Sequence, residues 1–202
     1  MSQYEQTLVL IKHDGVSRGL VGEIITRFEK VGLKIVAMKL VSASLDIAKN
    51  HYPSTDDWFS NVGNRVIAEF KEKKLDIFAK FETDNAIEIG KKIKEWNIEY
   101  LTFGPILAIV FEGPNSIKLV RKMIGDTNPS IAVPGTIRGD YSLDNGDVAS
   151  MYFRPIYNLI HASSSVEDAI YEIDLWFNKN EIYEYDLAHH SVMGLNHKLK
   201  HK

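Results

Sequence analysis

Several basic and imidazole side chains lie in parts of the chain that are rich in turn residues. Lys12 follows an apolar run, Arg121 and Thr127 flank a glycine, and Arg138 and His161 follow further turn-forming stretches. Lysine and arginine neutralise charge on phosphate oxygens, and a neutral imidazole is a competent nucleophile near pH 7. The combination suits phosphoryl transfer.

The two standard phosphate-binding loops are missing from the sequence. Neither the P-loop pattern nor the protein-kinase glycine loop occurs. Residues 125–129 and 134–140 are loop-forming instead, and loops on a rigid scaffold carry function disproportionately. Each polar residue also has a structural alternative, such as a solvated lysine at a strand end or an arginine that complements a helix dipole. If a nucleotide binds, neither standard loop holds it.

The elements that must position these groups follow from hydrophobic patterning. Apolar runs predict strands at residues 7–11, 33–41, 106–111 and, more briefly, 158–160. Helical spacing predicts helices over residues 21–31 and 115–124. Strands and helices mixed at these intervals favour an α+β fold, a sheet covered by helices.

A further helix is predicted after His161, because apolar residues recur there at helical spacing. Ser164-x-x-Glu167 has the spacing of a capping box, so Ser164 is expected to start this helix and leave His161 just before it. A helix N-terminus at that place would favour an incoming anion.

Two extra segments and a tail interrupt this plan. Residues 64–100 include an amphipathic helix whose apolar stripe must pack on the body or on another subunit, and residues 144–157 form a loop insertion. Residues 189–202 form a basic, histidine-rich tail that we expect to be mobile and solvated, because its histidine spacing matches no metal-ligand pattern. The chain is thus predicted to be a single domain over residues 1–188 with two insertions.

Composition excludes several classes of protein. The 202 residues contain no cysteine, which rules out disulfides, thiolate-bound metals and a cysteine nucleophile and fits a cytoplasmic protein. The net charge of −3 argues against a nucleic-acid-binding module. No apolar run approaches the ~18 residues that span a bilayer. We therefore expect a globular protein without a membrane or specific nucleic-acid partner.

Six motifs in order make the chain similar to nucleoside diphosphate kinases. The resemblance begins at TLVLIKHDGV and RGLVGEII in the first 25 residues and resumes at His51-Tyr52 and Gly104-Pro105. It continues through RKMIGDTNP, PGTIRGD and NLIHAS, and ends in the helix that contains EIDLWF. The match covers about three quarters of the chain.

The resemblance implies a ferredoxin-like βαββαβ fold with a four-stranded antiparallel sheet, and ping-pong transfer of a γ-phosphoryl from a nucleoside triphosphate such as ATP to a nucleoside diphosphate. His161 matches the nucleophile, and Ser163 and Glu172 match the pair that orients it. The residues that match ligands of phosphates and sugar hydroxyls are Lys12, Tyr52, Arg121, Thr127, Arg138 and Asn158. Mg²⁺ is expected on the nucleotide phosphates rather than in a protein cage. Relatives assemble as hexamers or tetramers built from dimers, so a homo-oligomer is expected.

The resemblance leaves some questions open. Trp58 and Val62 have the four-residue spacing of the family's base clamp, but Phe59 and Gly63 have it too, and Trp58 could instead be a packing residue. His13 stands where the family usually has proline. Ser164 replaces the usual aspartate. A catalytically weak or inactive nucleotide-binding relative is therefore the alternative function.

The insertion at residues 144–157 comes just before Asn158. We therefore expect it to reshape the base or sugar end of the site.

Overall fold

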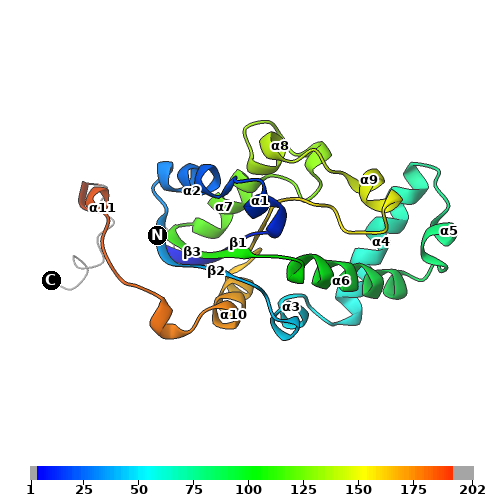
Figure 1. The fold of residues 1–202 in the computed structure, drawn as a ribbon, viewed down its shortest axis with the longest axis horizontal. Helices are drawn as coiled ribbons and strands as arrows, with labels where there is room; N and C mark the ends of the chain where they lie inside the picture. Colours follow the sequence, from blue (N-terminus) through cyan, green and yellow to red (C-terminus); the bar gives the residue numbers. More distant parts are fainter. Residues whose placement is uncertain (1–3, 193–202) are drawn as a thin grey trace.

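A four-stranded antiparallel sheet forms the centre of the computed structural model, which describes residues 4–192 (Figure 1). The strands are β1 (Tyr4–Ile11), β2 (Lys34–Val41), β3 (Ile106–Pro114) and β4 (Ile160–Ala162). Their order in the sheet is β2-β3-β1-β4, and every neighbouring pair is antiparallel. The predicted α+β, ferredoxin-like fold is confirmed.

The short strand β4 begins two residues later than predicted. Leu10 of β1 pairs with His161, and Val9 pairs with Ala162. His161 therefore lies on a strand rather than at the start of a helix. The next helix, α10 (Val166–Trp176), is capped by the side chain of Ser165, which accepts a hydrogen bond from the backbone N–H of Asp168. The prediction that Ser164 caps this helix is wrong, because pairing with β1 keeps the chain extended through Ala162.

Apolar side chains on the two faces of β1 enter two separate cores. Val9 and Ile11 pack with side chains of α2 (Val21–Lys30) and α7 (Ser116–Ile124). Leu8 and Leu10 face the opposite side, where α3 (Leu45–His51) and α10 cover the sheet. Because helices cover both faces of the sheet, both faces of β1 are buried, as its apolar run predicted.

The first extra segment forms a helical hairpin at one end of the molecule (Figure 1). Its helices are α4 (Asp56–Glu72), α5 (Ile77–Phe81) and α6 (Ala86–Thr102). The apolar stripe of α6 packs within the same chain, where Ile89 contacts a small core that includes Phe70 and Phe81. A Cβ atom on Gly90 would lie 2.1 Å from the carbonyl oxygen of Phe59, so the two long helices can cross this closely only at a glycine.

The second extra segment meets the first. Three short elements lie on the upper side of Figure 1: α1 (His13–Ser17), the 3-10 helix Pro129–Ile131 and α8 (Ile137–Tyr141). After α8, the chain forms α9 (Gly146–Met151) beside α4. Lys73, the residue that follows α4, forms a 2.6 Å ion pair with Asp147, and Lys80 Nζ lies 3.7 Å from the ring centroid of Phe153. The two insertions therefore form one continuous wall.

The C-terminal part continues through a 3-10 helix, Lys179–Glu181, to α11 (Ala188–Val192). The prediction of a solvated tail is wrong at His190, whose side chain is buried. The remainder of the expected tail, residues 193–202, lies outside the described residues. Among those described, no helix has the length and apolar character needed to cross a bilayer.

Candidate active site

One ring nitrogen of His161 is hydrogen-bonded to the carboxylate of Glu172. Its Nε2 lies 2.8 Å from Oε1 of Glu172, whose other oxygen accepts a 2.6 Å hydrogen bond from Ser163 Oγ. Ser163 Oγ in turn accepts a hydrogen bond from the backbone N–H of Leu8 on β1. The structure thus brings together the three residues expected to form the nucleophile and its orienting pair.

The other ring nitrogen of His161 is left open. Within residues 4–192, no hydrogen bond engages Nδ1, and a quarter of the side chain is exposed. With a proton on Nε2 donated to Glu172, Nδ1 carries a lone pair in the neutral ring. The arrangement therefore leaves one defined ring nitrogen with an available lone pair.

A second histidine that the sequence reasoning did not select stands next to His161. The ring centroids of His51 and His161 are 4.4 Å apart, and Trp176 Nε1 donates a 3.3 Å hydrogen bond to His51 Nδ1. Burial, followed by the neighbouring His161 and Lys12, holds the pKa of His51 well below its usual value. His51 is therefore neutral at pH 7. In the sequence, the position of His51 next to Tyr52 in a family motif was the signal that could have identified it.

Lys12 and Asn158 form the second part of the site. Lys12 Nζ donates a 2.8 Å hydrogen bond to Asn158 Oδ1, and Asn158 Nδ2 donates to the carbonyl of Thr127. Burial, and then the nearby Arg138, lowers the pKa of Lys12 to about 7. An incoming phosphate would stabilise the charged ammonium here.

Arg138 connects the loops around this lysine. Its guanidinium donates to the carbonyl oxygens of Asn158, Gly125 and Ile160, at 3.1, 2.9 and 2.5 Å. Burial lowers its pKa to about 10, so the group stays charged at neutral pH. Three of the five N–H groups of an arginine are used in this way, which leaves one on each terminal nitrogen for a ligand.

The backbone before His161 adopts an unusual conformation. Leu159 has a φ of +66°, in the left-handed region, and its N–H donates a 3.1 Å hydrogen bond to the carboxylate of Asp14. The carbonyl of Leu159 accepts from the N–H of Lys12. Strain of this kind persists where the surroundings hold it, as at functional sites. Asp14, a residue of the first quoted motif, is thus a positioning residue that the sequence reasoning missed.

Arg121 and Thr127 are exposed at the rim of this region. Arg121 lies near enough to Arg138 to contribute to lowering its pKa. Two exposed or partly exposed donors beside a buried cationic pair are suited to an anionic ligand that arrives from solvent.

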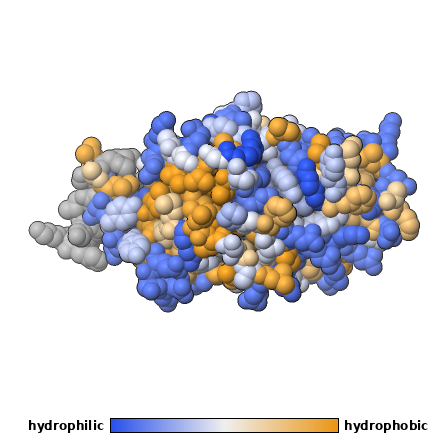
Figure 2. Space-filling view, in the orientation of Figure 1, coloured by the Kyte–Doolittle hydropathy of each residue, from blue (hydrophilic) through white to orange (hydrophobic). Residues whose placement is uncertain are grey.

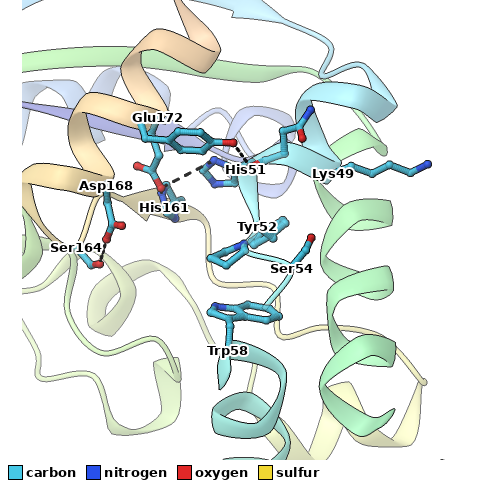
Figure 3. A pocket seen from close by; sticks show the side chains of 12 residues that line it. Lys49, His51, Tyr52, Ser54, Trp58, His161, Ser164, Asp168 and Glu172 are labelled. Carbon is cyan, nitrogen blue, oxygen red and sulfur yellow. Dashed lines mark hydrogen bonds and ion pairs between the residues drawn. The ribbon is translucent and has the colours of Figure 1, made fainter. Parts of the chain in front are cut away.

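A cavity of about 700 Å³ adjoins His161 (Figure 3). It is lined by Tyr52, Trp58, Ser164 and Asp168 together with the His161–Glu172 pair. Val62 lies one turn after Trp58 on α4 and is partly buried, but it does not line the cavity.

The helix crossing decides which aromatic residue is available as a base clamp. Phe59 is buried, and its backbone lies against Gly90. Gly63 faces Ala86 of α6 in the same crossing. Of the two candidate aromatic residues, Trp58 therefore lines the cavity and Phe59 does not.

The chemistry of the donor groups bears on metal binding. Among the described residues, one cluster could hold an ion: the donor atoms of His51, His161 and Glu172 lie within 4.8 Å of one another. Two imidazoles and one carboxylate are not a magnesium cage, since Mg²⁺ prefers oxygen ligands and water. The oxygens of Ser164 and Asp168, which are hydrogen-bonded to each other at the cavity, fit a hydrated ion carried by phosphates.

Comparison with known proteins gives a consistent result. The family model for nucleoside diphosphate kinase matches residues 5–93 and 59–182. A nucleoside diphosphate kinase from Pyrobaculum aerophilum is 46% identical over 180 residues, covering 89% of this chain and 98% of the relative. One from Pyrococcus furiosus is 44% identical and covers 92% of this chain and 90% of the relative. The alignment with the first leaves too few residues out to omit the 64–100 segment, so that relative shares most of it.

Solved structures are similar as well. An NDP kinase from Pyrobaculum aerophilum superposes with a TM-score of 0.88 at 44% identity, covering 90% of this chain and all of that one. A nucleoside-diphosphate kinase from Borrelia burgdorferi, solved as a transition-state mimic with vanadate and ADP, gives a TM-score of 0.76 at 33% identity, with 96% and 98% coverage. The chain belongs to the nucleoside diphosphate kinase family, a family of phosphotransferases that bind nucleotides.

Proposed function

We propose that this protein transfers the γ-phosphoryl group between nucleotides through a phosphohistidine on Nδ1 of His161. The observation that carries the proposal is the 2.8 Å contact between Glu172 and Nε2, which leaves Nδ1 as the open nitrogen. ATP is the proposed donor, and a nucleoside diphosphate is the acceptor.

The reaction has two symmetrical halves. The Nδ1 lone pair attacks the γ-phosphorus, a P–N bond forms, and the bond to the bridging oxygen breaks as the nucleoside diphosphate leaves. A terminal phosphate oxygen of the second diphosphate then attacks the same phosphorus and releases the imidazole. The proton on Nε2 stays in its hydrogen bond to Glu172, whose negative charge stabilises the positive ring in between.

The polar residues of the site are assigned to the charge that phosphoryl transfer spreads over phosphate oxygens. Lys12 and Arg138 are buried cations next to the strained turn before His161, and Arg121 stands at the rim. Stabilisation by positioned charges is the main requirement of such a reaction. Asn158, Thr127 and Tyr52 are proposed to bind phosphate and sugar oxygens.

The cavity is proposed to receive the base. Trp58 offers an aromatic face there, whereas Val62, one turn further on α4, lies outside the lining and is proposed to support Trp58 from behind. An aromatic face accepts purines and pyrimidines alike because every base has a π-face. The packing of Phe59 against α6 supports Trp58 rather than Phe59 as the aromatic residue of the proposed clamp.

Members of the family typically use a divalent metal. We propose Mg²⁺, bound to the nucleotide phosphates and not in a protein cage. When bound, such an ion neutralises phosphate charge and orients the chain of phosphates. Asp168 restores a carboxylate beside Ser164 and is the residue that we expect nearest to the ion's water shell.

A homo-oligomer built from dimers, either a hexamer or a tetramer, is also proposed. Strand β2 is an edge of the sheet and exposes half or more of the side chains of Met38 and Leu40. Figure 2 shows a hydrophobic patch in the region where β2 and β3 lie in Figure 1. Exposed apolar surface at a sheet edge is typical of an interface. Light scattering at low protein concentration tests the proposed oligomeric state.

We also propose the cytoplasm as the compartment of this protein.

A phosphorylation assay tests the mechanism. Protein incubated with ATP and Mg²⁺ should form an acid-labile, base-stable adduct, and ³¹P and ¹⁵N NMR should place the phosphorus on Nδ1. His161→Asn should form no adduct, whereas His51→Gln should still carry one. An adduct on the His161 variant, or on Nε2 of the parent protein, would contradict the proposal. An inactive protein would identify it as a non-catalytic relative.

A further inference from the structure

Lys12 has a second contact that the nucleotide chemistry does not require. Its ammonium lies 4.7 Å from the ring centroid of Tyr100, the tyrosine near the end of α6. Both side chains are almost completely buried, with 7% and 3% of their surfaces exposed. An ammonium at this distance from an aromatic ring is stabilised by the negative face of the ring, most strongly where water is excluded.

Tyr100 is itself clamped by the second insertion. The ring of Tyr157 lies parallel to it, with centroids 4.7 Å apart and an angle of 6° between the planes. The ring of His13 contacts it edge-on at 4.8 Å. A stacked partner and an edge partner together leave the ring little freedom to tilt.

Tyr157 is fixed in its turn. The Asp144 carboxylate accepts a 2.6 Å hydrogen bond from the backbone N–H of Tyr157 and forms an ion pair with Arg154. The Arg154 guanidinium lies 4.2 Å from the Tyr157 ring centroid. The next residue along the chain, Asn158, accepts the hydrogen bond from Lys12. Both contacts of the ammonium therefore depend on the same short stretch of chain.

We propose that Tyr100 is a positioning residue for Lys12: its ring, held by Tyr157, fixes the ammonium where the phosphates bind. The inference rests on the proposed function of Lys12 as a phosphate ligand. It assigns a role to the two insertions, which carry the aromatic pair and meet at the lysine.

The charges around the lysine explain why a ring is needed there. A buried ammonium is costly unless it is compensated, and Lys12 also faces the like charge of Arg138, while only Asp14 opposes that effect. Burial, and then the adjacent Asp14, raises the pKa of Tyr100 well above its usual value, so the phenol stays neutral and no phenolate competes with the phosphate. An aliphatic side chain would fill the space but would not stabilise the charge.

The experiment compares Tyr100→Leu with Tyr100→Phe. Leucine removes the ring and should lower kcat/KM for ATP about tenfold. Phenylalanine keeps the ring and should retain most of the activity. Tyr183→Leu, at an exposed tyrosine, is the control and should change nothing.

A second readout does not depend on activity. Titration of ¹³C-labelled lysine by NMR, with the Lys12 signal assigned from Lys12→Arg, should show a lower Lys12 pKa in Tyr100→Leu and an unchanged one in Tyr100→Phe. This measurement stands even if the protein transfers no phosphate, so failure of the proposed function is distinguished from failure of this inference.

Three results would overturn the inference. The first is an unchanged or raised Lys12 pKa in Tyr100→Leu, and the second is equal loss of activity in the leucine and phenylalanine variants. If Tyr100→Leu does not fold, Tyr157→Leu replaces it, because Tyr157 is only partly buried. Loss of the stack should then lower kcat/KM about threefold. The third result that would overturn the inference is full activity together with an unchanged Lys12 pKa in Tyr157→Leu.

Discussion

The two walls of the site are built differently. One, the sheet wall, consists of Lys12, Arg138, Asn158 and His161, each of which is fixed by at least one hydrogen bond to another part of the chain. The other, the helical wall, is the face of α4 that carries Trp58. Among the described residues, the Trp58 ring makes one aromatic contact, an edge contact with Phe59 at 5.6 Å.

The difference matches what each wall has to recognise. Every nucleotide presents the same phosphates, so fixed charges at fixed positions serve all substrates. Bases differ in shape and hydrogen-bonding groups, and a surface that offers mainly contact area discriminates little among them. We therefore expect mutations in the sheet wall to reduce turnover and mutations in the helical wall to affect mainly binding or stability.

The largest effect is expected for Lys12→Ala. Removing a buried cation that is proposed to bind the phosphates should lower kcat/KM about 10²- to 10³-fold, equally for all nucleotides, in a coupled spectrophotometric assay. Lys49 lines the cavity but is exposed, and Lys49→Ala is the matched control with less than a threefold expected effect. Equal losses in both variants would remove the distinction between a positioned and a solvated charge.

Glu172→Gln should have the next largest effect. The amide keeps nearly the same shape and can still accept from Nε2, but it lacks the charge that stabilises the phosphorylated ring, so kcat should fall about 100-fold. Ser163→Ala removes the donor to the second carboxylate oxygen and the acceptor for the Leu8 N–H but leaves the Glu172 charge, so it should cost less, about tenfold. Rapid-quench measurement of phosphohistidine formation separates the two. A Glu172→Gln variant with normal rates would show that orientation alone suffices.

Much of the sheet wall could be predicted from the sequence. Lys12, Arg138, Asn158 and Glu172 lie within motifs whose order is preserved, and the apolar run before Lys12 specifies a strand with both faces buried. Three successive serines precede α10, however, and local pattern does not choose among them. The pairing of Ala162 with Val9 makes the choice, because it extends β4 to Ala162 and leaves Ser165 as the residue that caps α10.

The helical wall could not be predicted in the same way. The stripe on α6 indicated a helix, but not that the helix crosses α4 at Gly63 and Gly90 or that its last turn meets the second insertion. These contacts join residues more than 20 positions apart, and such partners leave no periodic signal in either segment. Tyr100 and Tyr157 were missed for that reason.

Gly90→Ala tests how tightly α4, which carries the helical wall, is packed against α6. A Cβ at this position would overlap the Phe59 backbone, which cannot rotate away, so the free energy of unfolding should fall by about 2 kcal/mol in urea denaturation. Gly22→Ala on α2 is the control: nothing lies within 4 Å of its Cβ, and alanine favours helix there. Unchanged stability of Gly90→Ala would mean that α4 and α6 can separate easily.

Acid should weaken the region behind the nucleophile. The pKa of His51 is lower in the folded protein than its usual 6.5, chiefly because of burial, so the unfolded chain binds more protons as the pH falls below 6.5. The stability contributed by neutral His51 is thus complete above pH 6.5 and is lost toward lower pH. Thermal unfolding between pH 7.5 and 5 should show this decline, and His51→Gln should reduce the slope. A slope that the variant leaves unchanged would assign the decline to other groups.

The smallest effect is expected for Trp58→Leu. Loss of one stacking face should raise KM about fivefold while kcat stays the same, because the phosphates remain held by the sheet wall. The increase should be similar for ADP, GDP and CDP, since the ring offers contact area rather than hydrogen bonds. Val62→Ala, one turn further on α4, should change KM by less than twofold. A fall in kcat for Trp58→Leu, or a rise in KM confined to one base, would instead tie the helical wall to the chemical step or to base selection.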